Sequence, residues 1–80
     1  EFLNAILDEF QIKFEIPESR YSVLKIFNVV GEEVASLING RLNAGSYEVT
    51  FDGSNYPSGV YFYRLTAGEF SEEKKMVIIK

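Results

Sequence analysis

The chain has 80 residues, a net charge of −4 at pH 7, and neither cysteine nor histidine. Without cysteine the chain cannot form disulfides or use a thiolate, and without histidine it lacks the commonest general base and transition-metal ligand. The negative charge disfavours binding to nucleic acid, because the phosphates would be repelled. One small domain without a membrane span is expected, since the longest apolar run, Met76 to Ile79, is far shorter than the roughly 20 residues that cross a bilayer. Because the first residue is not methionine, we expect an excerpt of a longer protein.

The first nine residues have a helical pattern. Apolar residues recur at helical spacing from Phe2 to Phe10, while Asn4, Asp8 and Glu9 lie on the other side of the helix. This spacing predicts a short amphipathic helix within a linker or atypical N-terminal segment, residues 1–9. If that helix is exposed, its apolar side would permit self-association through residues 1–10.

From residue 10 onward, apolar and polar residues alternate as they do in strands. The pattern predicts six strands, over residues 10–16, 21–29, 33–38, 46–51, 60–66 and 70–79. Asn39-Gly40 has the composition of a hairpin turn, although the polar residues after it are equally typical of a loop. Residues 52–58 are rich in turn formers and predict a connecting loop.

Short strands at this spacing, without a long helix, indicate an all-β fold. We expect residues 10–80 to form a small immunoglobulin-like antiparallel β-sandwich of about six to seven strands. Alternation places one set of apolar side chains toward its core: Leu24, Ile26, Tyr61, Tyr63 and Leu65.

The segment Pro57-Ser58-Gly59-Val60-Tyr61 leads from a turn into the aromatic penultimate strand. In immunoglobulin-like sandwiches, a tyrosine at this place forms a tyrosine corner, in which the buried ring's hydroxyl bonds to backbone a few residues upstream. We assign that role to Tyr61 and expect its partner near the 52–58 loop. The alternative is an ordinary core aromatic, and both interpretations place residues 60–66 in a central strand.

The chain offers few groups for chemistry. The neighbouring carboxylates Glu32-Glu33 and Glu72-Glu73 would point in different directions on a strand or turn and do not make an acid and base pair. Asp52 and the polar residues after it are more typical of a self-stabilised turn than of a calcium loop, and Ser58 has no histidine to activate it. We expect no catalysis, no metal and no cofactor.

Several segments together, in order and spacing, resemble a known family: Ile16-Pro17-Glu18, Leu24 to Gly31, Glu33 to Leu37, Ala44-Gly45, Val49 to Asp52, Pro57 to Tyr63 and Lys74 to Lys80. From Phe10 to Lys80 the chain resembles the C-terminal sorting domains of cargo proteins exported by the bacterial type IX secretion system. It departs from that family at Asn4-Ala5-Ile6, where family members carry a proline-rich motif.

The resemblance implies a non-catalytic address that carries a cargo through the periplasm and outer membrane to the cell surface or the medium. The implied partners are the outer-membrane type IX machinery, a sortase-like peptidase that removes the domain, and an N-terminal cargo domain.

Two groups of residues are candidates for this role. Gly31, Gly45, Gly59 and Tyr61 are expected to shape the fold, and the contact surface for the machinery is expected to use Pro57, Ser58, Gly59, Lys74, Lys75 and Lys80. Lysines on a terminal strand also protect a sheet edge against aggregation. The two roles are compatible, since an accessible edge is what recognition by strand addition requires.

The main alternative is an immunoglobulin-like accessory or carbohydrate-binding module of a secreted hydrolase, with a platform built from Tyr47, Tyr56, Phe62 and Phe70. A structural spacer domain is a third interpretation. Position in the parent protein distinguishes the first two, because a sorting domain ends its chain and an accessory module can be internal.

Overall fold

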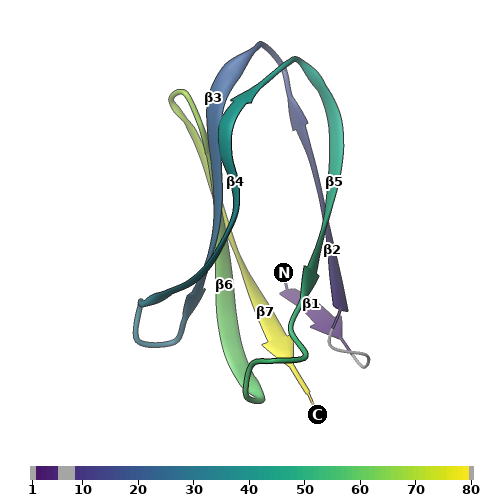
Figure 1. The fold of residues 1–80 in the computed structure, drawn as a ribbon, viewed down its shortest axis with the longest axis vertical. Coiled ribbons are helices and arrows are strands. Elements are labelled where there is room, and N and C mark those ends of the chain that lie inside the picture. Colours follow the sequence, from purple (N-terminus) through teal and green to yellow (C-terminus); the bar gives the residue numbers. More distant parts are fainter. Residues whose placement is uncertain (1, 6–8, 80) are drawn as a thin grey trace.

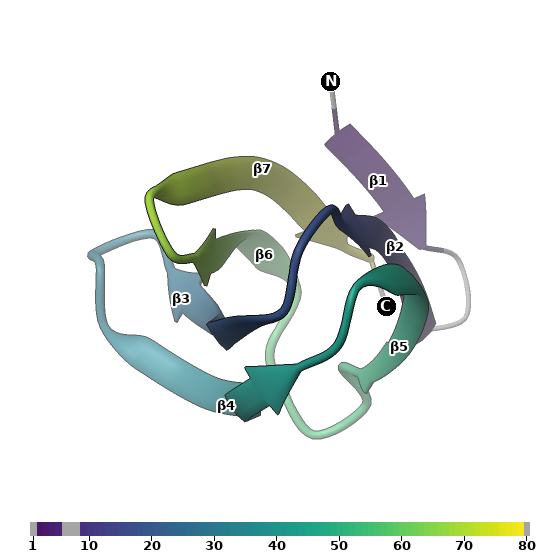
Figure 2. The ribbon, with the colours of Figure 1, turned by 90° about the horizontal axis from the view of Figure 1, so that it is seen from above.

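The computed structural model describes residues 9–79 in full and the backbone of residues 2–5, and within them seven β-strands form two facing sheets (Figures 1 and 2). The strands are β1 (Phe2–Ala5), β2 (Glu9–Ile16), β3 (Arg20–Asn28), β4 (Glu33–Leu42), β5 (Gly45–Asp52), β6 (Gly59–Ala67) and β7 (Phe70–Ile78). The larger sheet has the order β1-β7-β6-β3-β4, and β2 pairs with β5 in the smaller sheet. The expected small all-β sandwich is confirmed.

The core lies between the sheets and follows the alternation in the sequence. Strand β2 buries every second residue from Phe10 to Ile16. In the facing sheet, Leu24 is paired with Leu65 and Ile26 with Tyr63 across β3 and β6, and all four side chains are buried. The predicted inward faces of these strands are therefore correct.

Strand β4 is longer than the sequence indicates. The expectation of a hairpin turn or loop at Asn39-Gly40 is wrong. Asn39 pairs with Val23 and Gly40 with Ser22, so both residues lie inside the ladder between β3 and β4. The turn preference of an Asn-Gly pair is local and weak, whereas β3 offers backbone partners along its whole length. The chain instead turns after Leu42.

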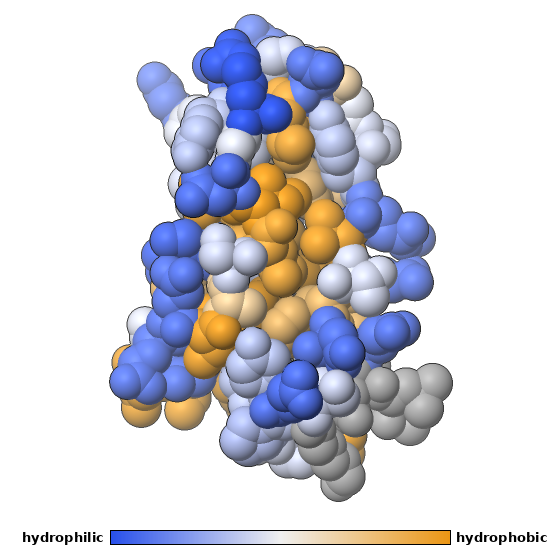
Figure 3. Space-filling view, in the orientation of Figure 1, coloured by the Kyte–Doolittle hydropathy of each residue, from blue (hydrophilic) through white to orange (hydrophobic). Residues whose placement is uncertain are grey.

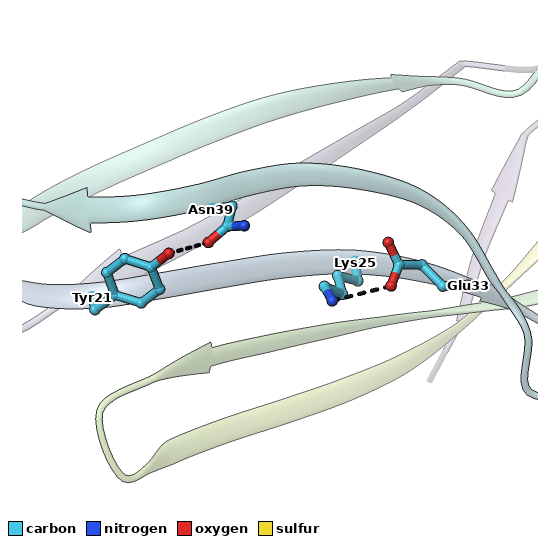
Figure 4. Close-up of polar contacts among 4 residues, drawn as sticks. All are labelled: Tyr21, Lys25, Glu33 and Asn39. Carbon is cyan, nitrogen blue, oxygen red and sulfur yellow. Dashed lines mark hydrogen bonds and ion pairs between the residues drawn. The ribbon is translucent and has the colours of Figure 1, made fainter.

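Side-chain contacts on the outer face also fix β4 against β3 (Figure 4). The Tyr21 hydroxyl donates a hydrogen bond to the side-chain oxygen of Asn39, and the Lys25 ammonium lies 3.0 Å from a carboxylate oxygen of Glu33. The two register shifts of this ladder lie between these contacts and near its end. Such shifts bend and twist a strand.

The turn between β3 and β4 is organised by Asn28. Its side-chain oxygen accepts hydrogen bonds from the backbone N–H of Val30 at 3.1 Å and of Glu32 at 2.9 Å. Gly31, within the same turn, has a φ of 91°. Side chains with a Cβ rarely adopt this conformation, which gives the glycine a structural reason.

The helix expected in residues 1–9 is not what the described residues form. Phe2–Ala5 is strand β1, which pairs in parallel with Lys75–Ile78 of β7. A helix of fewer than three turns is marginal in water, whereas the open edge of β7 offers unpaired backbone N–H and C=O groups to a strand. The prediction of self-association through residues 1–10 rested on this helix and therefore loses its basis. Residues 1 and 6–8 lie outside the described residues.

Candidate functional site

The predicted contact of Tyr61 is present. Tyr61 is 6% exposed, and its hydroxyl donates a hydrogen bond of 2.7 Å to the carbonyl oxygen of Pro57, four residues upstream. Gly59, between them, has a φ of 154°. The turn before β6 is thus tied to the core through one side chain.

A second tyrosine has the same local geometry, which the sequence analysis missed. The Tyr47 hydroxyl donates a 2.6 Å hydrogen bond to the carbonyl oxygen of Asn43, also four residues upstream, and Gly45 between them has a φ of 150°. The signal was available, because Gly45-Ser46-Tyr47 and Gly59-Val60-Tyr61 share a Gly-x-Tyr pattern. The Tyr47 bond is exposed, whereas the Tyr61 bond is partly buried.

Replacing Tyr61 with phenylalanine is expected to lower the free energy of unfolding by about 1–2 kcal/mol, because the Pro57 carbonyl loses its partner in a partly buried place. Tyr47→Phe is the matched control, since it removes the same kind of bond where water can replace the hydroxyl. Urea denaturation of both variants gives the comparison. Equal effects of the two substitutions, or none at Tyr61, would contradict a structural role for the buried bond.

The pairing of β6 with β7 places the predicted contact turn beside the end of the closing strand. Gly59 pairs with Ile78 and Val60 with Val77, and Pro57, Ser58 and Gly59 are exposed. Figure 1 shows this turn at the same end of the molecule as the C-terminus. The turn and the last residues of β7 therefore lie side by side at this end.

Lys74 and Lys75 lie farther along β7 and point to opposite faces of the sheet. Lys74 pairs with Tyr63, whose ring is in the core, and its ammonium lies 3.6 Å from the Glu72 carboxylate. Lys75 pairs with Phe62 and faces outward. The structure thus separates these lysines from each other and from the turn, and Lys80 lies outside the described residues.

Only the first half of the closing strand lies at the edge of its sheet, within the described residues. Strand β7 lies between β6 and β1, and β1 runs beside Lys75–Ile78. The expectation of a terminal edge strand is wrong for this half of β7. No β1 residue pairs with the first half, Phe70 to Lys74, within the described residues.

The aromatic residues considered for a carbohydrate platform do not share one face. Tyr47 stacks on Phe14 with ring centroids 5.5 Å apart, and Tyr56 packs against Phe51 at 5.5 Å. Phe62 lies on the outer face of the larger sheet, opposite Phe27. Tyr47, Tyr56 and Phe62 therefore do not form one flat stacking surface, and Phe70 is exposed at the start of β7.

The described residues contain no cluster of three or more carboxylates that could hold a metal ion. Glu72 and Glu73 contact different cations, because Glu73 lies 3.1 Å from Arg64 while Glu72 faces Lys74. They do not converge as a pair. Residues 2–5 and 9–79 also include no helix long and apolar enough to span a membrane.

Comparison with known proteins gives three results. No curated protein sequence matches the chain. An uncharacterized protein from Bacillus anthracis strain Ames has a solved structure with a TM-score of 0.64 and 15% sequence identity, covering 94% of this chain and 75% of its own, which shows similarity of fold alone. The family model described as the secretion system C-terminal sorting domain matches residues 4–80.

Proposed function

The chain belongs to the family of secretion system C-terminal sorting domains and is a sorting signal for type IX secretion cargo, and we propose that the export machinery contacts the end of the domain where the Pro57–Gly59 turn meets β7. Export by this route takes the cargo to the cell surface or the medium. Sorting domains of this kind are typically non-catalytic. We extend this to residues 1–80 and assign them no enzymatic activity of their own.

The proposal of this contact surface is supported mainly by the pairing of Gly59 with Ile78. It brings the exposed turn of Pro57, Ser58 and Gly59 against the closing residues, so a partner at this end touches both segments at once. Lys80 follows Ile78 by two positions in the sequence, and Lys75 faces outward on the same strand. Lys74 and Lys75 lie farther from the turn and on opposite faces of β7, so their part in recognition is proposed as separate contacts.

The finer partner assignments follow the family. A sortase-like peptidase is proposed to remove the domain after export, and an N-terminal cargo domain is proposed to precede it. Residues 1–9, which include β1 at the edge of the larger sheet, are then proposed to connect the cargo to the body of the sandwich in residues 10–80. Fusing residues 10–80 or residues 1–80 to one reporter tests the division. Export should survive without residues 1–9 if they are only a connection.

Replacing Lys75 and Lys80 together with glutamine should reduce export of a reporter fused to residues 1–80. The host is a bacterium with type IX secretion, and a signal peptide brings the reporter to the periplasm. Glutamine preserves much of the side-chain length, and exposed charges contribute under about 1 kcal/mol to stability, so the melting temperature should change little. Reporter in the periplasm and at the surface is then measured.

The matched control replaces Lys13 and Arg41, two exposed cations away from β7, with glutamine. It removes the same charge and should leave export unchanged. Equal loss of export in both variants would mean that net charge, rather than the end of β7, is recognised. Normal export of both would exclude Lys75 and Lys80 from the contact.

A further inference from the structure

The sandwich is open along one side, between β4 and β5. Apolar side chains on these strands and in the following loop pack against the core and remain half-buried: Val34, Ala35, Leu37, Ile38, Leu42, Tyr47, Val49 and Tyr56. Figure 3 shows a hydrophobic strip along the middle of this side, with hydrophilic residues on both flanks. The opening therefore leaves a continuous apolar surface against which further chain could pack.

The unequal width of the two sheets explains the opening. The larger sheet has five strands and the smaller only two, and in the described part of the chain β5 has a strand neighbour on one side only. Strands in a sheet lie about 4.8 Å apart and facing sheets about 10 Å apart. A third strand beside β5 would consequently lie over the inner face of β4, where Ile38 and Leu42 are half-buried.

Strand β5 is a better template than β4. It pairs with β2 without interruption from Gly45 to Asp52, whereas the β4 ladder contains two register shifts, which make an edge a poor template. The Tyr56 hydroxyl also donates a 3.1 Å hydrogen bond to the Val34 carbonyl at the lower end of β4. The Tyr56–Val34 hydrogen bond closes one end of the opening, and the regular edge of β5 is where an added strand would pair.

The outer face of the smaller sheet is acidic. Its outward positions carry four carboxylates and a single lysine: Glu9, Glu15, Glu48, Asp52 and Lys13. Glu48 lies on β5 itself, so an added strand would have outward side chains directly beside it. Opposite charges on neighbouring strands attract and like charges repel, which selects a basic outward face on the partner.

From the open apolar side, the regular edge and this charge, we infer that β5 binds an extended segment of a partner protein by strand addition, with apolar residues facing inward alternating with outward lysine or arginine. Its backbone would complete the smaller sheet and its apolar side chains would cover β4. This surface follows β5 and the inner face of β4, whereas the contact proposed for export is formed by the Pro57–Gly59 turn and β7. The inference does not depend on the proposed function.

The probe is a synthetic eight-residue peptide in which lysine alternates with valine or leucine, titrated against purified residues 1–80. A peptide of identical composition, with its apolar residues in one block, is the control for charge attraction alone. The alternating peptide should bind at least about tenfold more tightly, because only it presents one apolar face. Hydrogen exchange should slow at residues 45–52, with the β1 and β7 amides unaffected.

Two variants with the same change in net charge locate the edge. Glu48→Lys with Thr50→Lys places positive charge on the outward face of β5, beside the proposed strand, and Glu15→Lys with Gln11→Lys does so on β2. All four positions are exposed, which favours retention of the fold. We expect the β5 variant to bind the alternating peptide about tenfold more weakly and the β2 variant to change far less.

Three results would overturn the inference. Equal weakening by both variants would show attraction to net charge, and slower exchange on another strand would place the peptide elsewhere. Sedimentation showing a dimer of the chain alone, with the β5 amides already protected, would make a second copy the occupant instead.

Discussion

Alanine in place of Leu24 or Leu65 is expected to lower the free energy of unfolding by roughly 2–5 kcal/mol. Both side chains have an exposed fraction of 0%, and they pair directly across β3 and β6 at the centre of the larger sheet. Removing either leaves a cavity that surrounding residues cannot fill without moving. Because small domains have total stabilities of about 5–15 kcal/mol, the loss is a large share of the total. Urea midpoints measure it.

Val23→Ala is the matched control, because Val23 is adjacent to Leu24 on the outer face and only half-buried. Its expected cost is about 1 kcal/mol, from a smaller loss of buried area. The double variant Leu24→Ala with Leu65→Ala should deviate from additivity, since the two residues are direct neighbours. A larger effect at Val23 than at Leu24 would mean that the core lies on the other face of β3.

The predicted core could be read from the sequence because alternation in a strand is a local property. Every inward position of β2 was identified, and in β6 all but Ala67, which lies just beyond the predicted strand, since apolar and polar residues alternate with period two and one face is buried. The fold class followed from the same pattern, repeated over short strands separated by turn formers. These inferences need no knowledge of which strands are neighbours.

The errors arose where pairing between distant segments decided the structure. Asn39-Gly40 continues β4 because β3 is long enough to pair with it. Phe2–Ala5 forms β1 because β7 lies beside it. Strand β3 directly precedes β4, but Asn39 pairs with Val23 near the far end of this hairpin, and β7 is at the other end of the chain from β1. Local propensities alone cannot reveal either pairing.

For the candidate site, the contact of Tyr61 was predictable because its partner is only four residues away. The opposite orientations of Lys74 and Lys75 also follow from strand periodicity, although the sequence analysis grouped the two lysines. The contact of Tyr56 with Val34 spans 22 residues. Nothing local indicates it, and the same holds for the position of the Pro57–Gly59 turn beside Ile78.

Deleting Lys74 to Lys80 is expected to abolish export and leave the reporter in the periplasm. The deletion removes Met76 and Ile78, with exposed fractions of 0% and 1%, together with the backbone partners of Gly59 to Tyr63 on β6. Losing two large core side chains costs several kcal/mol, about 2–5 for each, so the fold itself should be lost. Cell fractionation locates the reporter, and the melting curve of the isolated domain reports folding.

Loss of folding and loss of recognition are separated by comparison with Leu65→Ala, which weakens the core and leaves the end of β7 and the Pro57–Gly59 turn in sequence. If the closing residues are the address, this variant should be exported whenever it is folded at the growth temperature, while Lys75→Gln with Lys80→Gln should be retained although folded. Retention that follows the melting temperature alone would mean that the machinery requires a folded sandwich and does not read these lysines. Export that continues after the complete deletion would place the address outside the closing strand.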